Sequence, residues 1–164
     1  MTSYSAIDYL LDKANIHDTI TKTFLYVDLL RWEDLEKEAF TDNIRVDCTS
    51  LFGAGEESAY DDVCFLPLPY ILPSHSSPRY RSLLIDLPQS GSIPSPMEAQ
   101  VTANFSVTLV PKDGEKGLVQ NGGRYHSEVS RITPSDGGNP WRISSLKADV
   151  VYFLGGKDFY EGSS

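Results

Sequence analysis

The chain has 164 residues, of which 40% are hydrophobic and 23% are charged. This length and composition are ordinary for one folded domain, and they argue against a disordered chain, a fibre or a coiled coil. The formal net charge of -9 gives a surface field that repels phosphate backbones, so the charge disfavours nucleic acid as a partner.

The N-terminal residues Met1 to Ala6 lack a basic region followed by an apolar run, and no segment reaches the roughly eighteen apolar residues of a membrane span. Cys48 and Cys64 fit neither a metal-binding spacing nor a disulfide framework, which favours free thiols in a reducing compartment. We therefore expect a cytoplasmic protein with no membrane partner.

The first forty residues carry apolar side chains at helical spacing. They fall into two groups, which are Ile7, Leu10, Leu11 and Ala14, then Ile16, Ile20, Phe24 and Val27. The groups predict a short helix followed by a longer one, with Asn15 as the N-cap of the second. A third helix is expected over Glu33 to Phe40, with Leu35 and Ala39 turned inward.

From Ile44 the hydrophobic period changes to two, which predicts a strand to Thr49 that leads into a glycine turn at residues 53–55. Four further strands are expected, over Tyr80 to Leu87, Val101 to Leu109, Arg124 to Ile132 and Trp141 to Phe153. The turn-rich segment Pro134 to Gly138 should join the last two in an antiparallel hairpin, and the four glycines of residues 114–123 are interpreted as another hairpin turn.

This order of elements, helices first and then a strand meander, predicts the α+β class, with a curved antiparallel sheet and N-terminal helices around one apolar pocket. Seven of the ten prolines lie between Leu66 and Pro96, so this stretch is interpreted as loops that form the variable rim of the pocket. We expect residues 1–164 to form a single domain.

Several signatures of cofactor chemistry are missing from the sequence. It contains no phosphate-binding loop, no dinucleotide fingerprint, no paired-histidine zinc motif and no nucleophile elbow. The three histidines His17, His75 and His126 are too scattered to suggest a metal site. We therefore expect neither a metal ion nor another cofactor.

Asp28 is the most informative polar residue, because it follows Phe24 and Ile20 by four and eight residues and so shares their inward helical face. Desolvation there would raise the pKa of the carboxyl toward the range that suits a general base. The alternative is an aspartate at a helix end that hydrogen-bonds the backbone, and the spacing leaves both open. Asp47 is the weaker candidate, since on an alternating strand it is expected to face solvent.

Alternation along the Arg124 strand places Tyr125 and His126 on opposite faces, so only one of them can line a cavity. The face that carries Val129 is the more apolar, which favours Tyr125 inside and His126 outside. Tyr26, Tyr70 and Tyr80 could supply further phenol donors, although most tyrosines in such a chain are packing residues.

Three segments together resemble a known family. They are Tyr26 to Asp28 followed by Trp32 to Leu35, then Val46 to Gly53, and last Gly123 to Arg131 with Trp141 to Ile143 and Gly155. Their order and spacing resemble the SnoaL-like polyketide cyclases and the scytalone dehydratases, which share the cone-shaped fold of nuclear transport factor 2. The resemblance covers most of the chain except the proline-rich middle.

The resemblance implies a cofactor-free enzyme that binds a polyketide or terpenoid intermediate and moves protons in it, giving cyclisation, dehydration or isomerisation. It also implies a homodimer or homotrimer. By position, Asp28 would be a pocket acid or base, and Tyr125 would line the pocket near the place of the dehydratases' substrate-binding asparagine.

Many relatives carry a histidine at the start of the strand that here begins at Tyr80. This sequence has Arg79, Tyr80 and Arg81 there, with His75 several residues upstream. Three alternatives stay open: His75 reaches the pocket from the loop, an arginine or tyrosine replaces the histidine, or the aspartate-histidine chemistry is absent.

The resulting hypothesis is a cofactor-independent lyase, isomerase or cyclase of natural-product biosynthesis that acts on a small hydrophobic substrate. Asp28 would be the general base, and Tyr125 or Arg81 would polarise a substrate oxygen. Substrate-binding side chains are expected at Phe24, Tyr26, Tyr80, Phe105 and Val129. One alternative is a cyclase that works mainly by holding its substrate in a reactive shape, and another is a noncatalytic binding or dimerisation module of the same fold.

Overall fold

The structure is a computed structural model that describes residues 4–47, 49–52, 79–91, 95–109, 119–134 and 137–155. Its elements in chain order are α1 (Ala6–Asp28), α2 (Trp32–Ala39), β1 (Phe40–Asp47), α3 (Thr49–Phe52), β2 (Arg79–Asp86), β3 (Glu98–Leu109), β4 (Val119–Arg131) and β5 (Trp141–Leu154). Both cysteines, His75, Tyr70 and most of the proline-rich rim lie outside the described residues.

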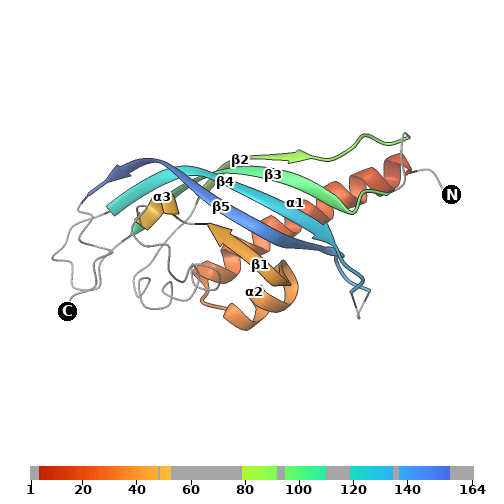
Figure 1. Ribbon diagram of the computed structural model, residues 1–164, viewed down its shortest axis with the longest axis horizontal. Helices are drawn as coiled ribbons and strands as arrows, with labels where there is room; N and C mark the ends of the chain where they lie inside the picture. The colour runs from red at the N-terminus through yellow and green to blue at the C-terminus, as the bar shows by residue number, and fades with distance from the viewer. Residues whose placement is uncertain are drawn as a thin grey trace.

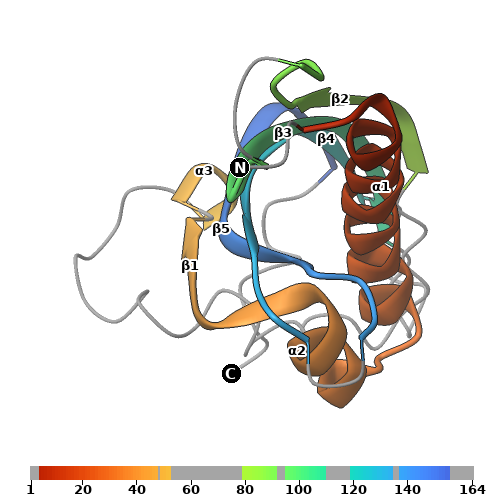
Figure 2. The same ribbon diagram turned by 90° about the vertical axis from the view of Figure 1, so that its right-hand side faces the viewer.

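The five strands form one sheet in the order β1-β5-β4-β3-β2. Strands β2 to β5 pair antiparallel, as expected, whereas β1 pairs parallel to β5 at the edge. The sheet is strongly curved, and α1 and α2 lie on its concave side (Figures 1 and 2). The expected α+β class with a curved sheet and N-terminal helices is therefore confirmed.

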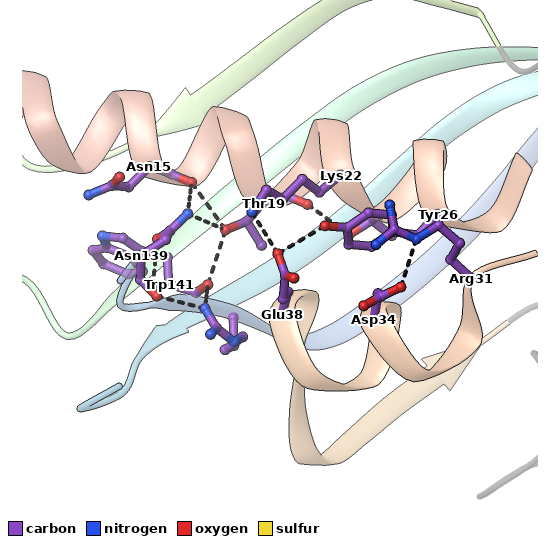
Figure 3. A network of polar contacts seen from close by, with 11 residues as sticks. Asn15, Thr19, Lys22, Tyr26, Arg31, Asp34, Glu38, Asn139 and Trp141 are labelled. Carbon is purple, nitrogen blue, oxygen red and sulfur yellow. Dashed lines mark hydrogen bonds and ion pairs between the residues drawn. The ribbon is translucent and has the colours of Figure 1, made fainter. Parts of the chain in front are cut away.

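Helix α1 is one continuous helix, so the prediction of two helices with an N-cap at Asn15 was wrong. The N-cap is Ser5, whose hydroxyl accepts from the Asp8 amide while the Asp8 carboxylate accepts from the Ser5 amide. Asn15 lies in mid-helix, where its carbonyl oxygen accepts from Thr19 Oγ1 and from Asn139 Nδ2 (Figure 3). Asn15 therefore lies within the helix and does not cap it.

The apolar residues of the first helical group do not enter the core. Ile7, Leu10 and Leu11 remain 70%, 63% and 57% exposed. The buried face of α1 is instead formed by Asp12, Ile16, Thr19, Ile20, Thr23, Phe24 and Tyr26. The helix thus has a second, exposed apolar stripe at its N-terminal end.

Helix α2 matches the expectation closely, because Leu35 and Ala39 are buried. Strand β1 begins at Phe40, four residues earlier than Ile44, since Phe40 is already opposite Ile143 of β5. The strand also ends earlier than predicted. Asp47 Oδ1 accepts from the amide and hydroxyl of Thr49, at 3.1 and 2.8 Å, and so starts the short helix α3.

Two glycines of β4 form a second difference from what the sequence pattern predicts. Gly122 and Gly123 belong to β4 and not to a turn, and β5 passes close to both. A Cβ atom on Gly123 would lie 1.9 Å from the backbone oxygen of Asp149, and one on Gly122 would lie 2.5 Å from the Tyr152 ring. The glycines therefore serve close strand packing at an irregularity between β4 and β5.

The hydrophobic core lies between α1, α2 and the concave face of the sheet. Its buried apolar members are Ile16, Ile20, Phe24, Tyr26, Leu35, Ala39, Phe40, Leu87, Ala99, Val101, Val129, Trp141, Ile143 and Leu146. The concave face is thus the apolar side on which a functional site was expected.

In the described part of the chain, no helix has the length and the apolar composition that crossing a membrane requires.

Candidate functional site

Three aromatic rings from three elements meet on the concave face. Tyr125 of β4 stacks on Phe105 of β3 with ring centroids 4.2 Å apart, and Phe24 of α1 lies 5.1 Å from Tyr125. Phe105 and Phe24 are buried, whereas Tyr125 is half-buried. We call these three residues the aromatic group. They are among the residues expected to bind substrate or to act on it.

The orientation of Tyr125 follows the alternation of its strand. Tyr125, Ser127 and Val129 are buried or half-buried, while His126 between them is exposed. On the convex face His126 Nδ1 lies 3.4 Å from Thr102 Oγ1 of the neighbouring strand. The inward placement of Tyr125 and Val129 and the outward placement of His126 are therefore as predicted.

Asp28 is the last residue of α1 and lies one helical turn beyond Phe24, so it shares a helix face with this member of the aromatic group. Its side chain is half-buried. The chain reverses directly after it through Leu30, which has a positive φ of 56°, and the Arg31 amide donates to the Tyr26 carbonyl at 2.8 Å. This turn and its hydrogen bond fix the backbone at the end of α1, where Asp28 lies.

Tyr26 is buried, but its hydroxyl is bound by α2. It donates to Glu38 at 2.9 Å, and Lys22 Nζ donates to the same carboxylate oxygen at 2.7 Å (Figure 3). These two hydrogen bonds hold the pKa of Glu38 below its usual value, and burial together with the bond to Glu38 raises the pKa of Tyr26. The Arg31 guanidinium covers the Tyr26 ring at 4.8 Å. Tyr26 thus joins α1 to α2, a role that its sequence position did not indicate.

For the remaining predicted residues, the structure describes at most the position of the backbone. Tyr80 is opposite Phe105 in the register of β2 and β3, which puts it level with the aromatic group. Arg81 lies at the register irregularity between Tyr80 and Ser82. The side chains of Tyr80 and Arg81, and the whole of His75, are outside the described residues.

Asp47 has a local role. Hydrogen bonds from the Thr49 hydroxyl and amide lower the pKa of its carboxyl, with a smaller contribution from Lys147, whose Nζ lies 3.4 Å away. Its carboxylate therefore caps α3 and pairs with β5, which agrees with the expectation that it was the weaker catalytic candidate.

A buried polar cluster near the N-terminal end of α1 was not predicted from the sequence. Asp12 accepts hydrogen bonds from Tyr4 at 2.9 Å, from the Trp141 indole at 3.1 Å and from Arg131. Arg131 also donates to the Pro96 carbonyl and covers the Trp141 ring at 4.8 Å. Burial, followed by the bond to Asp12, raises the pKa of Tyr4. This cluster fixes the N-terminal residues to the end of β4 and the start of β5.

The sequence did contain a signal for this cluster. Asp12 precedes Ile16 and Ile20 by four and eight residues, and so occupies the inward helical face by the same arithmetic that selected Asp28. An inward aspartate can serve the structure or take part in catalysis, and its hydrogen-bond donors distinguish the two roles. Because three donors from other parts of the chain bind the Asp12 carboxylate, its role is structural.

The residues of the concave face suit a particular kind of chemistry. Stacked aromatic rings favour a flat, unsaturated or ring-shaped ligand, a phenol such as that of Tyr125 can donate a proton, and a carboxylate such as that of Asp28 can accept one. Across the part of the chain that is described, no three His, Cys, Asp or Glu side chains gather as metal ligands would.

The fold is similar to that of several solved structures. The Kfla4162 protein from Kribbella flavida matches with a TM-score of 0.73 at 18% identity, over 94% of this chain and 100% of that one. The hexachlorocyclohexane dehydrochlorinase LinA-type3 from Novosphingobium barchaimii LL02 matches with a TM-score of 0.67 at 16% identity, over 92% and 94%. A conserved protein from Planctomyces limnophilus DSM 3776 gives 0.62 at 12%, over 85% and 96%.

No protein-family model matches the chain, and no curated protein matches it. At identities this low, the likeness to the solved structures shows the fold alone.

Proposed function

We propose that the chain is a cofactor-independent lyase, isomerase or cyclase that acts on a small hydrophobic molecule, such as a polyketide or terpenoid intermediate. The observation that carries the proposal is the aromatic group of Phe24, Phe105 and Tyr125, with the half-buried Asp28 one helical turn beyond Phe24. The dehydrochlorinase of the same fold supports it, because loss of hydrogen chloride is an elimination.

In the proposed reaction, Asp28 takes a proton from a carbon next to the substrate carbonyl. The electron pair of the broken C–H bond moves toward the carbonyl oxygen, which receives a hydrogen bond from Tyr125. Arg81 is the alternative donor to that oxygen. The resulting enolate then picks up a proton at another carbon, attacks a second carbonyl carbon to close a ring, or expels a leaving group from the neighbouring carbon with its bonding electrons.

The general-base role of Asp28 can be tested without the natural substrate. The protein is incubated with 1-tetralone in deuterium oxide, and NMR follows deuterium uptake at the carbon next to the carbonyl. We expect faster uptake with the wild type, with most of the acceleration lost in Asp28→Asn. Asp18→Asn is the control, because Asp18 is an exposed acid of the same helix.

The same experiment addresses both alternatives. A noncatalytic binder of the same fold would bind the ketone without any deuterium uptake. A cyclase that acts by positioning would tolerate Asp28→Asn and lose more activity when Phe105 or Phe24 is replaced by alanine. Binding without exchange in the wild type would therefore reject Asp28 as the base.

The assembly state is also part of the proposal. We propose a homodimer or homotrimer, as the family resemblance implies, and analytical ultracentrifugation measures it directly. A monomer at the protein's working concentration would reject this part while leaving the site chemistry intact.

A further inference from the structure

Helix α1 carries a row of outward-facing residues that is separate from its buried face. The row has the alternating spacing of four and three residues that defines a heptad repeat, and its members are Ile7, Leu11, Ala14, Asp18, Thr21 and Leu25. All six residues are exposed. Such spacing keeps one stripe of a helix in line with a second helix beside it. We call this row the outer seam of α1.

The two ends of the outer seam are apolar, and its middle is polar. At the N-terminal end Ile7 and Leu11 are 70% and 57% exposed, and Leu10 next to them is 63% exposed. At the C-terminal end Leu25 is 49% exposed, and Leu29, one helical turn further, is 55% exposed. Clusters of exposed apolar side chains are typical of a contact surface.

The turn after α1 adds another exposed leucine to the C-terminal end. Leu30 has a positive φ of 56°, and its amide donates to the Val27 carbonyl at 3.1 Å. In this kind of helix end glycine is the usual residue, because a side chain is strained at positive φ. Leu30 is nevertheless 51% exposed. A contact that its side chain gains only in an assembly would offset the strain.

We propose that the outer seam of α1 is the contact between two copies of this chain, whose α1 helices lie antiparallel about a two-fold axis near the middle of the helix. In this register Ile7 lies opposite the partner's Leu25, and Leu11 lies opposite the partner's Thr21. The two-fold axis repeats both contacts, so each apolar end covers the apolar end of the other copy. This contact rests on the assembly part of the proposed function, and it gives the homodimer a surface.

The charges on the outer side of α1 fit this arrangement. Asp8 lies level with the partner's Lys22 on the same flank of the seam, so opposite charges meet there. The outer side carries two acids and two lysines, which are Asp8, Asp18, Lys13 and Lys22. The whole chain, in contrast, has a net charge of -9. Two such acidic chains therefore repel each other less along this helix than over the rest of their surface.

The polar middle of the seam stays hydrated in this dimer. Asp18 lies opposite the partner's Ala14, whose small side chain leaves room for water beside the carboxylate. The contact therefore consists of two separate apolar ends. It should be weaker than an interface with a continuous apolar core, so the dimer should dissociate reversibly on dilution.

The test is analytical ultracentrifugation over a range of protein concentrations. Ile7→Glu and Leu25→Glu each place charges against an apolar partner residue, and each should weaken the dimer Kd by about 10-fold or more. Leu84→Glu is the matched control, because Leu84 is a 69% exposed leucine of β2, and it should leave the Kd unchanged. Dissociation by Leu84→Glu alone would place the interface on the sheet and overturn the inference.

Disulfide trapping tests the antiparallel register. In a chain that also carries Cys48→Ser and Cys64→Ser, a mixture of the Ile7→Cys and Leu25→Cys variants should form a linked dimer on mild oxidation, because positions 7 and 25 face each other. Either variant alone should stay unlinked, since the two copies of position 7 lie about 27 Å apart along the helix axis. Linkage of the single variants without linkage of the mixture would contradict the register.

The outcomes also separate the α1 contact from the proposed assembly state. A dimer or trimer that survives Ile7→Glu and Leu25→Glu would leave the assembly proposal standing and reject the α1 contact. A monomeric wild type would reject both. The acid-base chemistry tested by deuterium uptake does not depend on either result.

Discussion

Asp12 and Trp141, 129 residues apart in the chain, are joined by a 3.1 Å hydrogen bond from the indole nitrogen to a buried carboxylate oxygen. The bond ties the first helix to the first residue of the last strand. Because Arg131 and Tyr4 donate to the same carboxylate, one side chain holds four parts of the chain together. The concave face is formed by these same elements, so this cluster supports the geometry of the proposed site.

Replacement of Asp12 should destabilise the fold strongly. In Asp12→Ala, the Arg131 charge and two further donors lose their acceptor in a place where the Asp12 side chain is only 6% exposed. The expected loss in the free energy of unfolding is about 3 kcal/mol, measured by urea denaturation. Asp18→Ala removes a 68% exposed aspartate of the same helix and should change stability by less than about 0.5 kcal/mol. Equal effects of the two variants would contradict this role of Asp12.

Tyr4 should make part of the stability sensitive to alkali. The pKa of its phenol is raised by burial and by the bond to Asp12, so the folded protein keeps a proton that the unfolded chain releases above about pH 10. The Tyr4 contribution is therefore complete below that pH and is lost as the pH rises further.

The corresponding variant is Tyr4→Phe, which should be less stable than the wild type by about 1 kcal/mol near neutral pH. The difference should shrink above about pH 10 as the wild type loses the contribution of the phenol. Urea denaturation at a series of pH values measures both curves. Parallel curves from pH 7 to 11 would show that the phenol does not contribute in this way.

The stability that the Lys22–Glu38 ion pair between α1 and α2 contributes should fall in acid. The pKa of Glu38 is held low by hydrogen bonds from Lys22 and Tyr26, so its contribution is present above about pH 4.3 and is lost as the pH falls through the lowered value. Since the side chains of Lys22 and Glu38 are 42% and 35% exposed, we expect about 0.5 to 1 kcal/mol at neutral pH.

Stability measurements on Glu38→Gln, Lys22→Gln and the double variant test this contribution. The single variants should lose stability at pH 7 and approach the wild type below pH 4, and the double variant should lose less than the sum of the two. Additive losses would show that the two side chains act independently.

The glycines of β4 should differ in their tolerance of a side chain. In Gly123→Ala the new Cβ meets the backbone oxygen of Asp149, which moves only if the strand pairing shifts. The expected cost is about 3 kcal/mol or more. In Gly122→Ala the Cβ meets the movable Tyr152 ring, and the cost should be about 1 kcal/mol. Thermal unfolding measures both, and the reverse order would contradict the close approach of β5 to Gly123.

The fold was largely predictable because its strands alternate clearly. Val101, Ala103 and Phe105 are all buried on one face, as their spacing indicated. The helical period was less informative at the start of the chain. Ile7 and Leu10 follow it but are exposed, since an apolar stripe does not by itself reveal whether anything packs on it.

The site was predictable only in part. Alternation alone placed Tyr125 on the inner face, but its contact with Phe24 joins residues about a hundred positions apart, and no local pattern encodes such a pairing. The partners of Asp12 and Tyr26 were missed for the same reason: Trp141 and Glu38 come from other elements, and only the folded chain brings them to the acid and the phenol.

The central claim is that the concave face beside Asp28 binds a small hydrophobic molecule. The most direct measurement is a methyl NMR titration of the isotope-labelled protein with 2-naphthol. If 2-naphthol binds there, the methyl groups of Val101, Val129 and Leu146 should shift, while those of the exposed residues Ile7, Leu84 and Val151 should not. Shifts confined to the exposed methyl groups, or no shifts at all, would contradict it.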